Sequence, residues 1–411
     1  MLNISLLFVP RRSGGMEIFM SRKVASILQI NLIILSLPVV WLGFTYINQV
    51  SQEPWILIRI FTVFFVIVGV IIFSDIISSI FHETGHLIGG LLTGYTFVYY
   101  GLFGKIWLKI DGKLTRKKNN QKRLGGISQL TPPDMKDGTF PFRLYYLGGP
   151  LMNLILAGIC AMLFFLIAPF LPTWSIVFLI LGLKATTDFI MNILPVNNDG
   201  SWSDGYILFN FGKEKNAEIR LKYWRNFRIQ GFFIGGTRPR EIPETYYKWA
   251  NINKKIDDFF VVEAGFLRYK ALMDKRLLED AKKCMKAISS NLEPSMAGYK
   301  PAINLELIFH ELIGECREKE IRKLYTKEVE KYLQENAPNE SIQRISYAYF
   351  RLLIKDEEKA QMHLDLFNKA IENSINIGNI SSEKELIKLV DDIAHKRGEN
   401  KTSSTVNRKD D

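Results

Sequence analysis

The stretch Phe81-His82-Glu83-Thr84-Gly85-His86 closes a long apolar run. Histidines four residues apart lie on one face of a helix, one turn from each other, so both imidazoles can reach a single Zn²⁺ ion. Glu83, next to the first histidine, is suited to act as a general base toward a water molecule. The chain has only 5 histidines, and a Glu and two His inside an apolar segment are costly unless they are functional. The spacing therefore predicts two of three protein ligands of a zinc site together with its general base.

Apolar residues are unevenly distributed along the 411 residues of the chain. Long apolar runs fill residues 24–195, whereas the chain becomes charged from about residue 212. The net charge of +11 comes with basic residues beside apolar segments, which favours an anionic membrane surface over nucleic acid as the partner. Three cysteines that lie far apart (Cys160, Cys284 and Cys316) form neither a disulfide framework nor a metal knuckle. We therefore expect a membrane protein whose soluble part lies in a reducing compartment.

Four apolar segments are long enough to cross a bilayer, which takes about 20 helical residues. They are residues 24–46, 55–92, 143–170 and 173–194. The second is too long for one straight crossing, so it either continues past the membrane surface or breaks near Ser78-Ser79, and Gly94 is expected to end it. The basic segment 1–23 and the basic insert 94–142 both belong on the cytoplasmic side. Four crossings then leave the N- and C-termini in the cytoplasm.

The insert at residues 94–142 is polar and too basic to cross a membrane. Its residues Lys105 to Ile110 alternate between polar and apolar types, and the turn signal Asp111-Gly112 follows them. A second extended run, Thr96 to Tyr100, precedes this segment. The pattern predicts a small amphipathic β-hairpin on the cytoplasmic membrane surface. It is either a plain surface hairpin or a strand edge that pairs with an extended substrate segment.

Polar residues also occur inside the third and fourth apolar segments. The third opens with Gly148-Gly149-Pro150-Leu151-Met152-Asn153, and small residues of this kind allow helices to approach closely. Asn153 serves either helix packing or contact with a substrate or active site. Lys184 and Asp188, four apart in the fourth segment, are expected to form an ion pair within the membrane.

A third zinc ligand is required, because a catalytic zinc takes three protein ligands and keeps a fourth position open. A glutamate ligand fails, since the first Glu after His86 is Glu214, beyond the last apolar segment. A third histidine also fails, because Leu92 occupies the position that it would take. Two Asp-Gly pairs follow the fourth segment, and after four crossings they return to the side of the histidines. Asp199 and Asp204 are therefore both candidates.

These motifs, in this order, resemble the site-2 protease family of intramembrane zinc metalloproteases. The resemblance rests on His82–His86, on Gly149–Asn153 and on Asn192-x-x-Pro195 followed by an Asp-Gly stretch, and it covers roughly residues 55–208. It implies that His82, His86 and an aspartate bind zinc, that Glu83 is the general base, and that Asn153 lies near the substrate. The implied reaction is hydrolysis of a peptide bond in or near a membrane segment of a membrane-anchored protein or peptide.

Two features depart from the family pattern. Neither Asp199 nor Asp204 has the family's usual spacing from Asn192, and Asp204 is preferred because it leads into a helix-like run, as the family's Asp does. No peptide-binding insert of the PDZ type is visible, because the insert of about fifty residues is too short. The sequence therefore does not indicate how a substrate would be selected.

The remaining chain, residues 212–396, has a helical pattern throughout and forms a second domain after a membrane domain at 24–211. Two helical hairpins, at residues 266–288 and 349–371, are similar to tetratricopeptide modules, which suits recruitment of a cytoplasmic protein partner. The His310-Glu311 pair lacks a second histidine four residues on, so we expect ordinary helix there. The tail at 397–411 is expected to be disordered.

Taken together, the sequence predicts a mainly α, multi-pass protein of a bacterial cell membrane that acts as a zinc metalloendopeptidase. Two alternatives stay open. One is a protease that processes small exported peptides or pheromones. The other is a non-catalytic binding or immunity protein that keeps the fold, although the complete set of zinc-site side chains argues against it.

Overall fold

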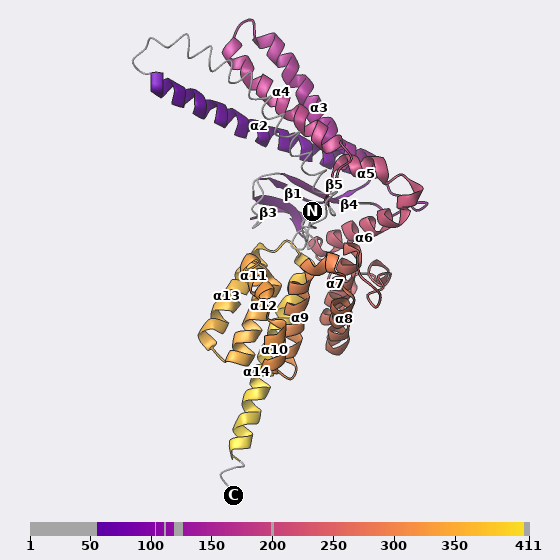
Figure 1. The fold of residues 1–411 in the computed structure, drawn as a ribbon, viewed down its shortest axis with the longest axis vertical. Coiled ribbons are helices and arrows are strands. Elements are labelled where there is room, and N and C mark those ends of the chain that lie inside the picture. Colours follow the sequence, from indigo (N-terminus) through magenta and orange to yellow (C-terminus); the bar gives the residue numbers. More distant parts are fainter. Residues whose placement is uncertain (1–55, 103, 111, 119–125, 199–200, 407–411) are drawn as a thin grey trace. The chain divides into compact units, whose positions relative to one another are not determined.

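The protein is described by a computed structural model covering residues 56–102, 104–110, 112–118, 126–198 and 201–406 (Figure 1). Predictions for the N-terminal segment 1–23 and the first apolar segment 24–46 fall outside the described residues. The described part is mainly helical, with 13 α-helices (α2 to α14) and a small four-stranded antiparallel sheet. The chain divides into two compact units. We call residues 56–102 with 126–221 the membrane-helix unit, and 104–118 with 222–406 the helical unit.

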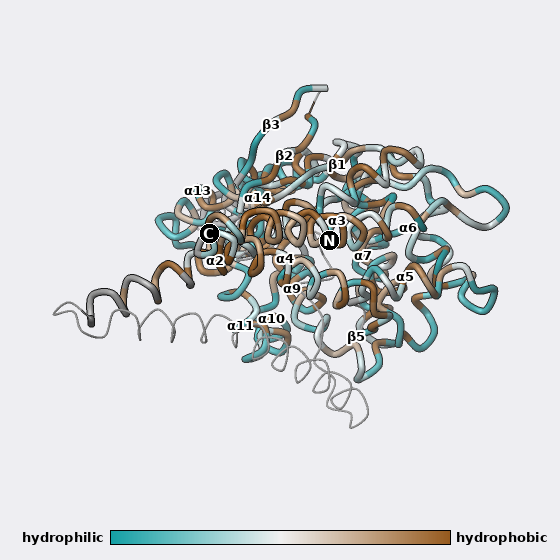
Figure 2. The backbone as a smooth tube through the Cα atoms, turned by 90° about the horizontal axis from the view of Figure 1, so that it is seen from above, coloured by the Kyte–Doolittle hydropathy of each residue, from teal (hydrophilic) through white to brown (hydrophobic). Residues whose placement is uncertain are grey.

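Three helices of the membrane-helix unit are long and apolar enough to cross a membrane. They are α2 (Ile56–Leu92), α3 (Phe142–Ile167) and α4 (Pro172–Ile193), and their apolar character is visible in Figure 2. Large apolar side chains such as Phe65 and Phe165 are exposed on them, which suits contact with lipid rather than water. These helices confirm three of the four predicted apolar segments within the residues that the structure describes.

Helix α2 is continuous over its 37 residues and has no break at Ser78-Ser79. At about 1.5 Å per residue it is about 55 Å long, well beyond the roughly 30 Å of a bilayer's hydrocarbon core. Its end is a Schellman motif, because the Tyr95 N–H donates to the Gly90 carbonyl and the Gly94 N–H to the Leu91 carbonyl. Gly94 has φ +83° there, a conformation that favours glycine. The predicted stop at Gly94 is confirmed.

The insert forms a larger sheet than the predicted hairpin. Its strands are β1 (Thr96–Leu102), β2 (Lys105–Ile110), β3 (Lys113–Lys118) and β4 (Ile127–Thr131), in the order β3-β2-β1-β4. Strands β2 and β3 form a hairpin in which Ile110 pairs with Lys113, and Gly112 in its turn has φ +79°. Neither β3 nor β4 was predicted as a strand. The basic strand β3 lies at the edge of the sheet, where charged residues are common.

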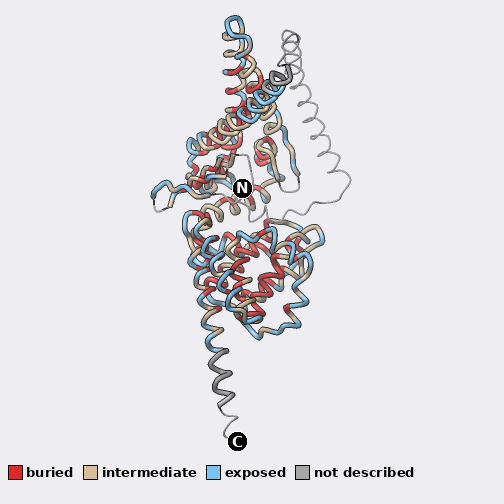
Figure 3. The backbone as a smooth tube through the Cα atoms, turned by 90° about the vertical axis from the view of Figure 1, so that its left-hand side faces the viewer, coloured by how far each residue is buried: buried red, intermediate tan, exposed pale blue. Residues whose placement is uncertain are grey.

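Apart from residues 104–118, the helical unit follows α4 along the chain. Helix α6 (Ala217–Ile234) begins in the membrane-helix unit and continues into the helical unit. Besides β2 and β3, the helical unit contains the helices α7 (Phe259–Asp274), α8 (Leu278–Asn291), α9 (Lys300–Ile313), α10 (Glu318–Leu324), α11 (Lys327–Glu335), α12 (Glu340–Ala348), α13 (Glu357–Asn373) and α14 (Ile377–Val406). These helices enclose a continuous apolar core. Figure 3 shows the buried residues of these helices in red.

The two predicted helical hairpins of this unit correspond to α7 with α8, and to a π-helical turn at Tyr349–Ile354 with α13. Helix α14 ends at Val406, within the segment for which disorder was predicted. His310 and Glu311 are buried in α9, as expected of an ordinary helix.

Candidate metal centre

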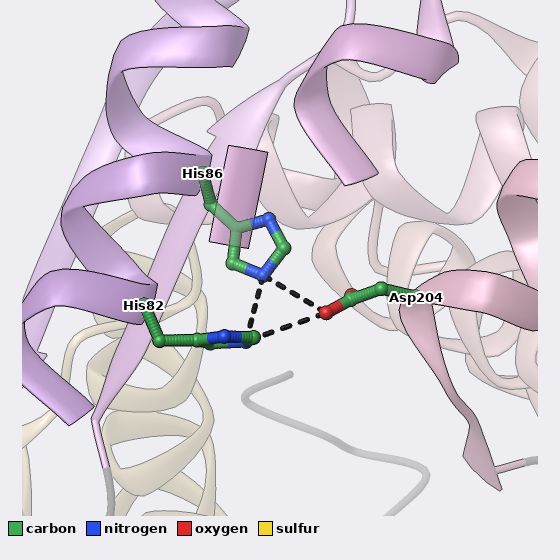
Figure 4. Close-up of side chains that lie close together, drawn as sticks. All are labelled: His82, His86 and Asp204. Carbon is green, nitrogen blue, oxygen red and sulfur yellow. Dashed lines mark hydrogen bonds and ion pairs between the residues drawn. The ribbon is translucent and has the colours of Figure 1, made fainter. Parts of the chain in front are cut away.

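His82, His86 and Asp204 come together within the membrane-helix unit. The two histidines lie one turn apart near the end of α2, and Asp204 is the first residue of α5 (Asp204–Asn210). All three side chains point toward one another (Figure 4). The two Nε2 atoms are 3.1 Å apart, and each lies 3.3 Å from Asp204 Oδ2. The three ligand atoms thus form a nearly equilateral triangle.

This triangle has the dimensions of a metal site. Ligands placed tetrahedrally around zinc at about 2.0–2.1 Å are separated from each other by about 3.3 Å. The three separations in the structure agree with that value, so the group could hold a metal ion. Two imidazoles and one carboxylate also leave a fourth position, the arrangement typical of catalytic rather than structural zinc. Of the two candidate aspartates, Asp204 lies beside the histidines, whereas Asp199 is outside the described residues.

Local interactions explain how the sequence Ser203-Asp204-Gly205 positions the carboxylate. The Ser203 hydroxyl accepts from the Tyr206 N–H at 3.1 Å, which caps α5, and it donates to the Leu194 carbonyl at 2.6 Å. A Cβ on Gly205 would lie 1.9 Å from the Ile193 carbonyl oxygen, so only glycine lets α5 begin directly against the end of α4. Ser203 and Gly205 therefore hold Asp204 at a fixed place directly after α4.

The pKa of Asp204 reflects this environment. Burial alone would raise it, but the charges of the two imidazoles and their hydrogen bonds outweigh burial and hold the pKa below its usual range. An ionised carboxylate is the form that binds a metal.

The outer nitrogens of both imidazoles are also engaged. His86 Nδ1 lies 2.7 Å from the Tyr145 carbonyl oxygen, so Nδ1 carries a proton and Nε2 is the nitrogen that would bind a metal. His82 Nδ1 lies 3.1 Å from Nδ2 of Asn153. Asn153 is fully buried, and its Oδ1 has no hydrogen-bond partner among the described residues. A half-turn of this amide would place Oδ1 where it accepts from Nδ1–H of His82.

The sequence left open whether Asn153 serves helix packing or contacts a substrate or the active site. The structure places its side chain against His82, one of the candidate ligands. A contact with substrate stays a prediction. Because Tyr145 contributes a backbone carbonyl, no side-chain pattern could have indicated its role.

Glu83 lies beside His82 on α2 and is half-buried. Gly126, just before β4, packs directly against it: a Cβ on Gly126 would lie 2.4 Å from Cγ of Glu83. Next to Glu83, the Thr84 hydroxyl lies 3.2 Å from the Tyr100 hydroxyl of β1. The start of β4 and strand β1 thus enclose this end of α2, and glycine at position 126 leaves room for the Glu83 side chain.

A separate charged group links α2 and α4. Lys184 Nζ lies 2.6 Å from Asp188, which confirms the predicted pair, and 3.0 Å from Asp75. Ser78 donates to Asp188 at 2.5 Å. Asp75 therefore neutralises part of the Lys184 charge between apolar helices, which is the structural role expected of paired charges in a membrane segment.

No protein-family model matches the chain, and comparison with curated proteins and with solved structures finds no similar protein. The function is therefore inferred from the site itself.

Proposed function

We propose that the protein is a zinc-dependent intramembrane endopeptidase, which hydrolyses peptide bonds in or near membrane-embedded segments. The observation that carries the proposal is the triangle of His82, His86 and Asp204 on a helix of membrane-spanning length, with Glu83 adjoining the first ligand. The resemblance of the three sequence motifs to site-2 proteases points to the same reaction. Bound zinc would act as a Lewis acid toward a peptide carbonyl and lower the pKa of a water.

The protein's own residues divide the remaining work. His82, His86 and Asp204 would hold the ion, and Tyr145 and Asn153 would keep the two imidazoles oriented. Glu83 would accept a proton from the attacking water and deliver it to the leaving amine. All six residues belong to the membrane-helix unit.

The apolar surroundings define the class of substrate. A site at the end of an apolar helix is reached by a peptide segment that itself enters the membrane. Such a segment is helical in lipid and its carbonyls are hydrogen-bonded, so it must unwind locally before Glu83 and the ligands can act on it. We expect a membrane-anchored protein or peptide as the substrate.

Zinc content tests the site. The detergent-purified protein is measured beside Asp204→Ala and Asp199→Ala, and we expect about one zinc per chain, lost only in Asp204→Ala. Loss in Asp199→Ala alone would move the third ligand to that residue. A wild-type protein that binds no zinc, even after zinc is supplied, would exclude the proposal and favour the non-catalytic binding protein.

Glu83→Gln then tests the reaction. This variant should keep its zinc and lose cleavage of a reconstituted peptide substrate with a transmembrane segment, by about 10²-fold or more, because general-base catalysis contributes that much. Cleavage at the wild-type rate would exclude Glu83 as the base.

A further inference from the structure

One face of the β2–β3 hairpin combines basic, aromatic and apolar side chains. Residues two apart in a strand share a face, which places Lys105, Trp107 and Lys109 together on β2. Directly opposed residues of an antiparallel pair also share a face. Arg116 opposes Trp107, and Leu114 opposes Lys109. We call these five residues the basic hairpin face.

This face is the outer side of the hairpin. Lys105, Lys109 and Arg116 are exposed, and Leu114 is 67% exposed. The residues that alternate with them on β2, Ile106 and Leu108, are fully buried. The hairpin therefore packs its apolar side against the protein and turns the basic hairpin face away from the core.

The cations of the basic hairpin face differ from Lys117 on the inner side. Lys117, which opposes Ile106, donates to the Ser374 carbonyl at 2.6 Å. Within the described residues, Lys105, Lys109 and Arg116 have no ion pair or side-chain hydrogen bond. Neither strand contains an acidic residue. The face thus carries three positive charges that nothing in the described part of the chain neutralises.

We propose that the basic hairpin face binds the anionic phospholipid headgroups of a membrane surface. Lysine and arginine are attracted to such headgroups, tryptophan prefers the membrane–water interface, and an exposed leucine gains by entering the acyl region. The hairpin also starts at Lys105, about a dozen residues after the candidate membrane helix α2 ends at Leu92. A bilayer is therefore within reach of the chain, and Leu114 favours lipid over nucleic acid, which offers no apolar phase for it.

Lysine footprinting of the full chain tests this inference. The protein is reconstituted in vesicles of phosphatidylcholine alone or mixed with phosphatidylglycerol, and acetylation of each lysine is measured by mass spectrometry. We expect Lys105 and Lys109 to be acetylated at least about fivefold more slowly in the anionic vesicles, because each basic residue near such a surface contributes about that factor. High salt should abolish the protection. Lys286 and Lys319, exposed in the helical unit, should not respond to the lipid.

A charge reversal on the same face supplies the second arm. Arg116→Glu should reduce the protection of Lys105 and Lys109 by about fivefold or more. Lys388→Glu, the same charge reversal at an exposed residue of α14, should leave it intact. Slow acetylation of Lys117 in both variants shows that the hairpin remains folded.

Equal acetylation of Lys105 and Lys109 in both vesicle types would overturn the inference. Protection by single-stranded RNA but not by anionic lipid would also overturn it and assign the face to nucleic acid. Zinc content does not enter any of these outcomes, so they are independent of the proposed protease activity.

Discussion

Gly85 of α2 and Gly148 of α3 meet backbone to backbone. A Cβ on Gly85 would lie 2.1 Å from the Gly148 carbonyl oxygen, and a Cβ on Gly148 would lie 2.2 Å from the Gly85 carbonyl oxygen. One turn further on, a Cβ on Gly89 would lie 2.3 Å from the Leu144 carbonyl oxygen. This crossing leaves no room for a side chain, and it brings His86 close enough to the Tyr145 carbonyl for a hydrogen bond. The glycine inside the His-Glu-Thr-Gly-His motif is therefore explained by packing.

Gly148→Ala should lower the thermal stability of the protein. The added methyl group must push the two backbones apart, and overpacking of this kind costs about 1–3 kcal/mol. The melting temperature of the detergent-solubilised protein measures the effect. Gly158→Ala on the same helix is the matched control, because a Cβ at Gly158 meets nothing within 4 Å. Equal melting temperatures of the two variants would contradict the close crossing of α2 and α3.

Gly149→Ala should act on the metal site instead. Its Cβ would lie 2.5 Å from Nε2 of His86 and 2.7 Å from Cε1 of His82, so both imidazoles would have to leave the triangle. We expect zinc affinity to fall at least about tenfold, as for other changes that disturb ligand orientation. Competition with a chromogenic chelator measures this affinity, with Gly158→Ala again as the control. Wild-type affinity in Gly149→Ala would mean that these imidazoles do not hold the metal.

Much of this arrangement was predictable, and the reason differs from residue to residue. The shared face of His82 and His86 follows from helical geometry, and the three long apolar helices follow from uninterrupted apolar length, so both are local properties of the chain. The choice of Asp204 depended on its position at the start of a helix, which α5 confirms. The contacts of Gly126 with Glu83 and of Asn153 with His82 join residues far apart in the sequence. Nothing in the neighbourhood of either residue indicates its partner.

Asn153→Ala should weaken zinc binding through His82. Without the amide, Nδ1 of His82 loses its contact with the Asn153 side chain, and such outer contacts contribute about 10–100-fold to metal affinity. The readout is again chelator competition. Asn153→Asp should retain most of the affinity, because its carboxylate accepts the same hydrogen bond. If both variants bind zinc as the wild type does, Asn153 serves packing or substrate instead.

Gly126→Ala should reduce peptide cleavage while the zinc content stays unchanged. The new methyl group would overlap Cγ of Glu83 and force that side chain into another rotamer, away from the position from which it takes a proton. Displacing a general base costs about 10²-fold in rate or more. The measurements are cleavage of a membrane-embedded peptide and metal content on the same sample. Gly138→Ala, at a glycine with open space around it but φ +70°, controls for a general effect of changing a glycine in the insert. Full activity in Gly126→Ala would show that Glu83 does not need this space.

Acidification should destabilise the helical unit through His310. This side chain is 3% exposed in α9, and burial lowers its pKa to about 4, with the positive charges of Arg344 and Lys282 acting in the same direction. In the unfolded chain His310 has its ordinary pKa of about 6.5. Between pH 6.5 and 4 this imidazole is therefore protonated in the unfolded state and neutral in the folded state. The stability that the neutral His310 contributes is therefore fully present above pH 6.5 and falls as the pH approaches 4, by up to about 3 kcal/mol.

Hydrogen exchange of the α9 amides at pH 7 and pH 5, corrected for intrinsic rates, measures the loss. His310→Gln should flatten this dependence, whereas His395→Gln, exposed on α14, should leave it as in the wild type. An identical pH dependence in His310→Gln would assign the acid sensitivity to other groups.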